Sequence, residues 1–177
     1  MQPRMWGSSS NGATVVESTR VRVWLSLGSN IEPRTNIQRA LDELRKEFGE
    51  LRISPIYESE AIGCEGNDFL NLVVGIETQL PVEALRSSLR AIETKLGRRR
   101  QSDKYAPRTL DIDLLIYGNL VIEGEGYRLP HDDITRYAFV LLPLSEVAGE
   151  EIHPRIGLSY RELWKRFDDP TQHLWRI

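Results

Sequence analysis

The stretch RTLDIDLLIYG, residues 108–118, combines a hydrophobic strand pattern with two acidic residues. Its apolar residues recur at every second position, at Leu110, Ile112, Leu114 and Ile116. Side chains of a strand alternate between its two faces, so this spacing predicts a strand with one continuous apolar row. Asp111 and Asp113 then share the other, exposed face, about 6–7 Å apart, where two carboxylates repel by about 2.5 kcal/mol at an effective dielectric constant of about 20. A bound cation would turn this repulsion into attraction.

A strongly basic segment, residues 98–109, precedes this strand. Its cations are Arg98, Arg99, Arg100, Lys104 and Arg108, and it also carries the aromatic Tyr105. Magnesium takes only one or two protein carboxylates and completes its shell with substrate phosphates, while arginine forks clamp phosphate oxygens. The acid pair alone also fits a solvated strand face, and the basic loop alone fits a solubility role. Together, at the end of a strand, they favour a metal–polyphosphate site.

Composition limits the class of protein. The 177 residues suffice for one domain with a sizeable core, and the hydrophobic (40%) and charged (28%) fractions are typical of a globular protein. A net charge of −3 argues against general nucleic-acid binding, and the single Cys64 excludes an internal disulfide. No apolar run approaches the ~20 residues of a membrane span. We therefore expect a cytoplasmic protein with a flexible N-terminal extension (1–20) and a single domain (21–177).

Hydrophobic periodicity predicts an alternation of strands and helices. Strands are expected at 21–27, 51–59, 69–80 and 110–116, and helices at 34–48 and 82–96. Their order, β-α-β-β-α-β, is that of the ferredoxin-like arrangement. A pair of short strands near 120–129 and helical segments near 137–148 and 159–168 complete the expected α+β domain, a ferredoxin-like βαββαβ sandwich with an added strand pair and C-terminal helices.

Single residues refine these boundaries. Pro55 indicates an edge strand or a bulge, because proline cannot donate to a central ladder. Pro81 suits the first turn of its helix and Gly97 the end of it. Ser159 with Glu162 forms a capping-box pattern, S-x-x-E, at the start of the last helix.

The segment RRRQSDKYAPRTLDIDLLIYGN resembles the signature of the 6-hydroxymethyl-7,8-dihydropterin pyrophosphokinase family of the folate pathway. The family pattern G-R-x-R, a variable basic loop and P-R-x-x-D-x-D-[ILV] is matched without a gap from Gly97 to Leu114. The resemblance extends to LSLGSN, FLN, IE, LPH and AFVLLPL, and so covers about residues 21–165. The ferredoxin-like order expected from periodicity is also the fold of this family.

The resemblance implies a transferase reaction. A pyrophosphoryl group would pass from ATP to the hydroxymethyl group of 6-hydroxymethyl-7,8-dihydropterin, with release of AMP. Asp111 and Asp113 would hold two Mg²⁺ ions, and Arg98 and Arg108 match arginines that stabilise the transferring group. The expected partners are ATP and the dihydropterin, without nucleic acid or membrane, and the expected state is a monomer.

The resemblance also assigns ligand contacts residue by residue. Positions matching the ATP side are Glu93, Arg100, Tyr105, Leu114, His131 and Arg136. Positions matching the pterin side are Ser59, Ile62, Phe69, Asn71 and Phe139. Phe69 and Phe139 would sandwich the pterin ring, and Asn71 would read its amide-like edge. Taken alone, the two aromatics also fit core positions, Asn71 a satisfied buried amide, and His131 a turn.

The sequence departs from the family pattern in several places, among them Tyr105, where a familiar member has a tryptophan, and Phe69, which replaces a common tyrosine. The loop 59–68 is one residue shorter than in a known member of the family. Glu60 and Ala61 stand where many members carry two prolines. Tyr137 stands where members often carry an arginine, with Arg136 one step earlier. These changes leave open a pterin- or nucleotide-binding paralogue with lost or altered activity. An RNA-recognition domain shares the strand order, but NLVVGIE lacks the aromatic motif which such domains need.

Overall fold

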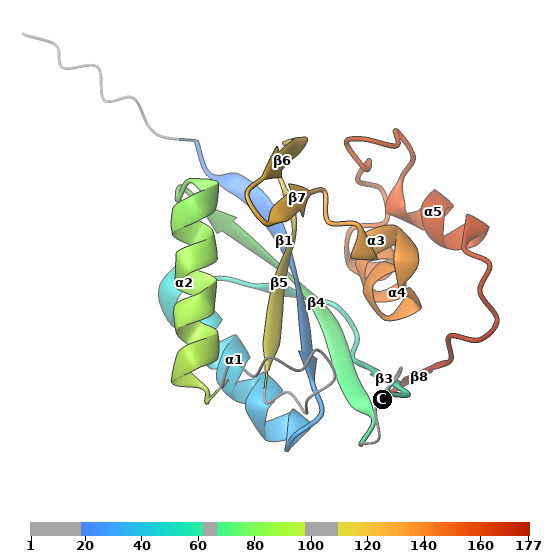
Figure 1. The fold of residues 1–177 in the computed structure, drawn as a ribbon, viewed down its shortest axis with the longest axis horizontal. Helices are drawn as coiled ribbons and strands as arrows, with labels where there is room; N and C mark the ends of the chain where they lie inside the picture. Colours follow the sequence, from blue (N-terminus) through green and yellow to red (C-terminus); the bar gives the residue numbers. More distant parts are fainter. Residues whose placement is uncertain (1–18, 62–66, 98–109) are drawn as a thin grey trace, which may run out of the picture.

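An antiparallel sheet forms the centre of the computed structural model, which describes residues 19–61, 67–97 and 110–177 (Figure 1). The strand order is β5-β1-β4-β3-β8, and β2 also pairs with β4. The strands are β1 (Val21–Ser29), β2 (Arg52–Ile53), β3 (Tyr57–Ser59), β4 (Phe69–Thr78), β5 (Asp111–Tyr117) and β8 (Leu174–Arg176). β5 and β8 therefore lie at opposite edges of the sheet.

Two long helices cover one face of this sheet. α1 (Pro33–Phe48) and α2 (Val82–Lys95) turn their apolar stripes toward the strands. Leu41 and Leu89 from these helices join Leu25, Leu72 and Ile112 from the strands in a first core. This core is the one that the helical periodicity of the sequence predicts.

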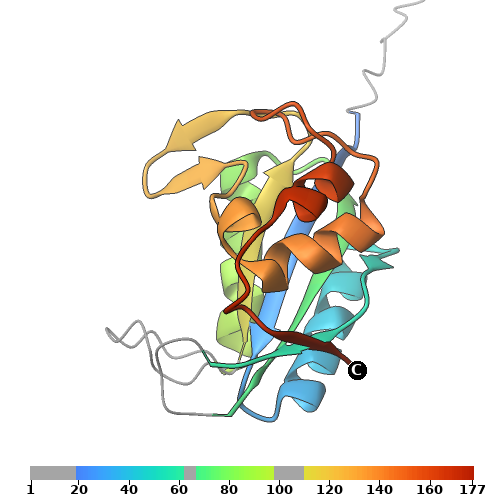
Figure 2. The same cartoon turned by 90° about the vertical axis from the view of Figure 1, so that its right-hand side faces the viewer.

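A second set of helices covers the opposite face (Figure 2). It consists of α3 (Asp133–Arg136), α4 (Ala138–Val147) and α5 (Tyr160–Arg166), and the hairpin of β6 (Ile122–Gly124) and β7 (Tyr127–Leu129) precedes it. Trp24, Val73, Leu141 and Leu144 belong to this second core. The sheet is thus buried on both faces. This explains why Trp24 is fully buried, although it lies on the same face of β1 as Arg22 and Ser26.

A β-bulge at Leu115 corrects the predicted apolar row of β5. The register with β1 shifts at this point, so that Leu25 faces Leu114 while Trp24 faces Ile116. The apolar residues before the bulge pack into the first core, whereas Leu115 and Ile116 pack into the second. The extra residue reverses the alternation, so the prediction that Ile116 continues the row was wrong.

The strand expected over 51–59 is two short strands, β2 and β3. Between them Ser54 stays attached to β4 by two hydrogen bonds: its N–H donates to the carbonyl of Val73, and its hydroxyl accepts from the N–H of Val73, both at 2.9 Å. Pro55 follows, so the interruption falls where the proline predicts it. β3 is covered by β8, which the sequence analysis does not predict.

The remaining elements agree with the sequence within a few residues. α1, α2, α4 and α5, and the β6–β7 hairpin, lie where they are expected, and only the short α3 is additional among the helices of the described residues. The hydroxyl of Ser159 accepts from the N–H of Glu162 at 3.2 Å, as the capping pattern predicts. The mixed α/β class with an antiparallel sheet is confirmed. No helix in the described part of the chain is both long and apolar enough to cross a membrane.

Candidate functional site

Asp111 and Asp113 lie at the beginning of β5, opposite Gly28 and Ser26 of β1. They precede the bulge, so they share a face as predicted, and this is the face that bears the second core. Both residues are half-buried rather than exposed. Partial burial strengthens the interaction of a carboxylate with a charged ligand, because less water screens it.

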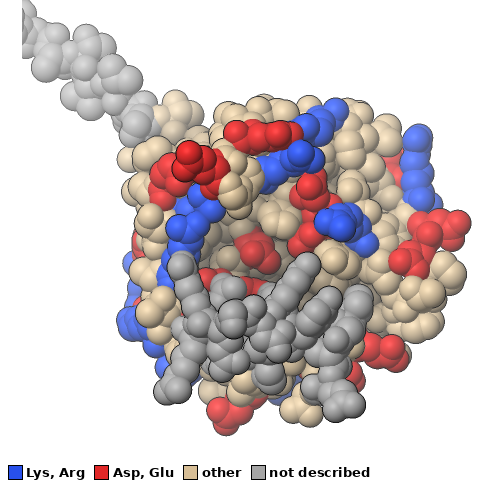
Figure 3. All heavy atoms as spheres, in the orientation of Figure 1, with Lys and Arg blue, Asp and Glu red and all other residues tan. Residues whose placement is uncertain are grey.

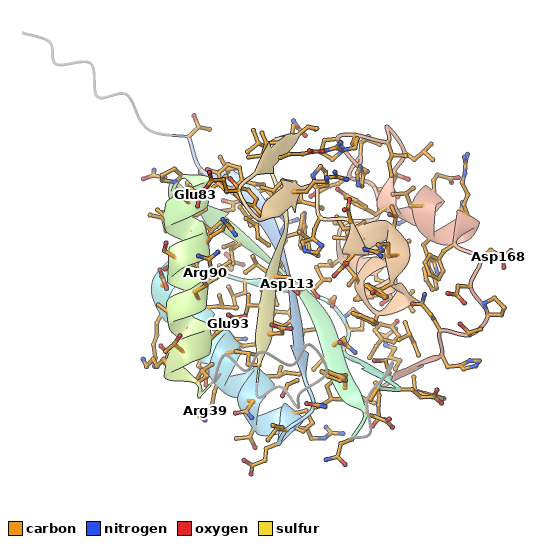
Figure 4. The ribbon with its side chains drawn as sticks, in the orientation of Figure 1. Arg39, Glu83, Arg90, Glu93, Asp113 and Asp168 are labelled. Atoms are coloured by element: carbon orange, nitrogen blue, oxygen red, sulfur yellow. The ribbon has the colours of Figure 1, made fainter. Side chains whose placement is uncertain are left out.

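A pocket of about 210 Å³ lies at the β5 edge of the sheet, between α2, β5 and the segment 126–131. Its lining includes four predicted site residues: Glu93, Asp113, Leu114 and His131. Figure 4 shows Arg90 and Glu93 on α2 and Asp113 on the neighbouring β5, and all three residues line this pocket. In Figure 3 this face is hollowed, with acidic atoms at its floor and both basic and acidic atoms along its upper rim. Residues distant in sequence are thus gathered in one site.

Glu93 connects α2 to the edge strand. Its side chain is buried, and its Oε1 accepts a hydrogen bond from the N–H of Ile112 at 2.7 Å. An edge strand has outward backbone groups that no neighbouring strand can pair. Glu93 satisfies one of them between Asp111 and Asp113, and so fixes the backbone on which both carboxylates stand.

His131 is positioned by the same edge strand. Its backbone N–H donates to the carbonyl of Leu115, the bulged residue, at 2.8 Å. Its Nδ1 accepts from the N–H of Asp133 at 3.1 Å. In the neutral imidazole the proton then resides on Nε2, which can donate to an anionic ligand. The structure therefore places His131 in a turn and in the pocket at the same time.

Three residues assigned to the pterin side lie together at the β3–β4 pair. Ser59 pairs with Phe69 in register, and the Asn71 side-chain amide donates to the hydroxyl of Ser59 at 2.9 Å. Asn71 is 4% exposed, and its Oδ1 would lie 3.2 Å from a Cβ placed on Gly28. Gly28 therefore leaves the space which this amide occupies. The hydrogen bond to Ser59 is also expected if Asn71 is only a buried amide with a structural role, the other interpretation given for this residue above.

Phe139 lies near this group from the other side. It lines a small pocket of about 30 Å³ together with Ser59. Its ring stacks on Tyr137, with centroids 5.0 Å apart and planes 16° apart. Tyr137, which the resemblance places where an arginine is often found, is therefore the packing partner of the aromatic residue predicted to contact the pterin.

The structure does not place Arg136 in this gathering. Arg136 is exposed at the end of α3, and it is absent from the described lining of either pocket. Its backbone carbonyl accepts from the side chain of Gln172 at 3.0 Å. Five predicted residues lie outside the described residues and stay predictions: Ile62, Arg98, Arg100, Tyr105 and Arg108.

Several residues that line the pocket were not predicted from the sequence, and two of them are arginines. Arg86 and Arg90 line it from α2, and the Arg86 guanidinium lies over the ring of Tyr127 with 3.9 Å to the centroid. Positions 86, 90 and 93 follow the i, i+4, i+7 spacing of one helix face. That spacing, beside an acid already selected, is the signal that could have identified the two arginines.

The oxygen donors on β5 fit a hard cation. Within the described ranges, no group of three or more His, Cys, Asp or Glu gathers to hold a metal. Magnesium needs no such cage, because one or two carboxylates suffice when substrate phosphates supply the other ligands. Asp111 and Asp113 would be those two carboxylates.

The chain is similar to known proteins over most of its length. The family model described as 7,8-dihydro-6-hydroxymethylpterin-pyrophosphokinase (HPPK) matches residues 24–149. A 2-amino-4-hydroxy-6-hydroxymethyldihydropteridine pyrophosphokinase of Synechocystis sp. is 38% identical over 147 residues, covering 81% of this chain and 75% of the relative. The enzyme of the same name from Pseudomonas aeruginosa is 38% identical over 133 residues, with 73% and 82% covered.

Longer proteins contain a similar unit. The folic acid synthesis protein fol1 of Pneumocystis carinii is 35% identical over 150 residues, which cover 83% of this chain but only 20% of that protein. A crystal structure of Plasmodium falciparum HPPK-DHPS superimposes with a TM-score of 0.68 at 16% identity, over 86% of this chain and 44% of the other. This chain thus spans about a fifth of the Pneumocystis carinii protein and less than half of the Plasmodium falciparum protein. Because the family model covers most of the chain, the protein belongs to the 7,8-dihydro-6-hydroxymethylpterin-pyrophosphokinase family.

Proposed function

We propose that this chain transfers a pyrophosphoryl group from ATP to the hydroxymethyl group of 6-hydroxymethyl-7,8-dihydropterin and releases AMP, with Mg²⁺ bound by Asp111 and Asp113. The observation that carries the proposal is the pocket at the β5 edge, where Glu93, Asp113, Leu114 and His131 meet. The names of the relatives, which are pyrophosphokinases, agree with it.

The proposal gives the pocket residues distinct tasks. Leu114 provides an apolar wall for the adenine. Arg90 and His131 present donors toward anionic oxygens, and Glu93 holds the strand that carries the acids. Phosphoryl-type transfer depends mainly on positioning and charge neutralisation, so these tasks need no strong base.

Mg²⁺ supplies charge neutralisation when it is bound, and two ions would serve both the attacking and the leaving oxygen. Asp111 and Asp113 provide its oxygen ligands from one strand face, held by β1 on one side and by Glu93 on the other. The arginines at 98, 100 and 108 are proposed to approach the phosphates from the basic segment.

The pterin is proposed to bind beyond the acids, near Phe69, Asn71 and Phe139. The relative arrangement favours this, because Asn71 pairs in register with Gly28, which also faces Asp111. The row Asp111–Gly28–Asn71 therefore crosses three adjacent strands from the proposed metal ligand to the proposed pterin ligand. Phosphate and hydroxymethyl groups would meet along this row.

The finer structural and cellular assignments belong to the same proposal. The sheet with α1 and α2 would be a ferredoxin-like core, residues 21–177 one domain, and residues 1–20 an extension. We also propose a monomeric, cytoplasmic enzyme. Each assignment follows from the resemblance or from composition.

Replacing Asp113 tests the proposed metal role. Asp113→Asn removes one anionic ligand, so pterin-dependent consumption of ATP should fall at least about a hundredfold. Asp168→Asn is the matched control, because Asp168 is exposed far from the pocket (Figure 4). Rates are measured over a Mg²⁺ titration. Equal rates for Asp113→Asn and the control would contradict the metal role of Asp113. If the wild-type protein binds the pterin but does not turn it over, the result would favour a binding paralogue with lost activity.

A further inference from the structure

The C-terminal segment, residues 169–177, lies beyond the part of the chain that the family model matches. It leaves α5 and returns to the sheet, where β8 pairs antiparallel with β3 and Leu174 faces Ser59 (Figure 2). Ser59 is the residue whose hydroxyl accepts from Asn71. The segment thus reaches the strand that supports the proposed pterin side.

Gln172 attaches this segment to the beginning of α4. Its Oε1 accepts from the N–H of Ala138 at 2.8 Å, and its Nε2 donates to the carbonyl of Arg136 at 3.0 Å. The first N–H groups of a helix have no partner within the helix, and the N-cap residue, Tyr137, provides no side-chain bond. Gln172 therefore caps α4 from 34 residues away in the sequence.

Asp169 holds Gln172 in this orientation. Its Oδ2 accepts from Nε2 of Gln172 at 2.8 Å, and its Oδ1 accepts from both the N–H and the hydroxyl of Thr171. These hydrogen bonds from Thr171 and Gln172 lower the pKa of Asp169. Both polar atoms of the Gln172 amide are thus engaged, and its position is fixed by its own turn.

Gln172 bonds to Arg136 and Ala138, and Phe139 directly follows Ala138 in the sequence. The ring of Phe139 stacks on Tyr137, and residues 171–174 face Phe139 and Ser59 across a space of only about 30 Å³. This space is far smaller than the roughly 300–1,000 Å³ of a small-molecule pocket, so residues 171–174 pack against Phe139 and Ser59 and do not form a second binding pocket with them.

From these contacts we propose that Gln172 is a positioning residue for the pterin: by capping α4 it sets the placement of Phe139, and through β8 its segment supports Ser59 and Asn71. The inference rests on the proposed function, because it concerns affinity for the same substrate. It adds a structural element outside the family match to the substrate site. The pocket proposed for ATP lies at the β5 edge of the sheet, opposite the β8 edge, and Gln172 is not among its described lining residues, so we expect ATP affinity to depend little on Gln172.

Gln172→Ala separates these two sides. The substitution removes three hydrogen bonds, to Ala138, Arg136 and Asp169. Loss of the cap on α4 should raise the Kd for 6-hydroxymethyl-7,8-dihydropterin by about three- to tenfold, with the Kd of a non-hydrolysable ATP analogue changed less than about twofold. Gln38→Ala is the matched control, because Gln38 is an exposed glutamine bonded to Asp42 on α1. Both constants are measured by calorimetry at a temperature where urea titration shows the variants to be folded.

Asp169→Ala provides a second variant, which releases the orientation of Gln172 without removing its amide. It should weaken pterin binding in the same direction and by a smaller factor. Unchanged pterin affinity in Gln172→Ala, or equal weakening for both ligands, would overturn the inference. Wild-type protein that binds no pterin would instead contradict the proposed function itself.

Discussion

At the scale of single residues, Glu93 joins fold and site. Its carboxylate accepts the outward N–H of Ile112 on an edge strand and lines the pocket that holds Asp113. A buried donor that loses its partner costs free energy because it has already lost water. The same side chain therefore contributes to the stability of β5 and to the placement of the acids.

Glu93→Ala should lower the free energy of unfolding by about 1–3 kcal/mol, since it leaves the Ile112 N–H unsatisfied. Glu83→Ala is the control on the same helix, where an exposed glutamate pairs with Arg86 at 3.3 Å and should contribute less than about 1 kcal/mol. Urea titration measures both. Equal losses for the two variants would show that the Ile112 bond is not important for stability.

Arg90 belongs to the same scale. If it donates to the phosphates, Arg90→Ala should raise the Kd of an ATP analogue by about tenfold or more, because hydrogen bonds to charged groups are worth about 1.5–3 kcal/mol. Arg39→Ala, on the exposed side of α1, should leave that Kd unchanged. Calorimetric titration in moderate salt is the measurement. An Arg90 variant with wild-type affinity would exclude the contact.

Residues of the site differ in how far the sequence predicts them. The hydrophobic pattern predicts the strand that carries Asp111 and Asp113 and the helix that carries Glu93. The family resemblance also identifies these three residues as site residues. From the sequence, Arg86 and Arg90 are ordinary solvent-facing positions of α2. Only the tertiary structure places β5 and the segment 126–131 beside them. Their role depends on tertiary contacts, which helical periodicity does not contain.

At the scale of elements, β5 shows both the strength and the limit of period-two alternation. The strand and its acids are predicted, but the bulge at Leu115 is not, because Leu115 and Ile116 are both apolar and either can face a core. The bulge also frees the Leu115 carbonyl for the His131 N–H. The irregularity therefore helps to place a residue of the pocket.

In the segment 153–158 the His153 side chain adds hydrogen bonds to those of the backbone. His153 is 4% exposed, and its Nδ1 accepts from the N–H groups of Arg155 and Ile156, both at 3.2 Å. Burial, with a smaller contribution from the charge of Arg155, lowers the pKa of His153 in the folded state. Protonation would place a donor where two donors already point.

Stability should therefore depend on pH through His153. The unfolded chain binds the proton near the ordinary value of 6.5, before the folded state does, so the free energy of unfolding falls as pH decreases from about 6.5 toward the lower folded pKa. Urea midpoints at about pH 7.5 and about pH 5.5 measure this fall. His153→Gln should reduce it, whereas His173→Gln, at an exposed position, should not. An identical fall in both variants would assign the pH dependence elsewhere.

Short elements were the hardest to predict. β8 is a three-residue strand, Leu-Trp-Arg, and α3 is a four-residue helix. Neither is long enough for a periodic pattern, and each is stabilised by partners from distant parts of the chain. β8 nevertheless completes the sheet edge at Ser59, and α3 carries Arg136.

At the scale of the whole molecule, one sheet separates two cores and carries the proposed site across its strands. Helices α1 and α2 support it from one face, and the acids of β5 open onto the other. The class and element order follow from hydrophobic pattern. The gathering of Glu93, Asp113 and His131 depends on strand order, which places β5 at an edge beside α2.

The product of ATP consumption tests the central claim most directly. Phosphorus NMR of the wild-type protein with ATP, Mg²⁺ and 6-hydroxymethyl-7,8-dihydropterin should show AMP and a pterin diphosphate in equal amounts, and none of either without the pterin. Formation of ADP and a pterin monophosphate would contradict pyrophosphoryl transfer and indicate an ordinary kinase.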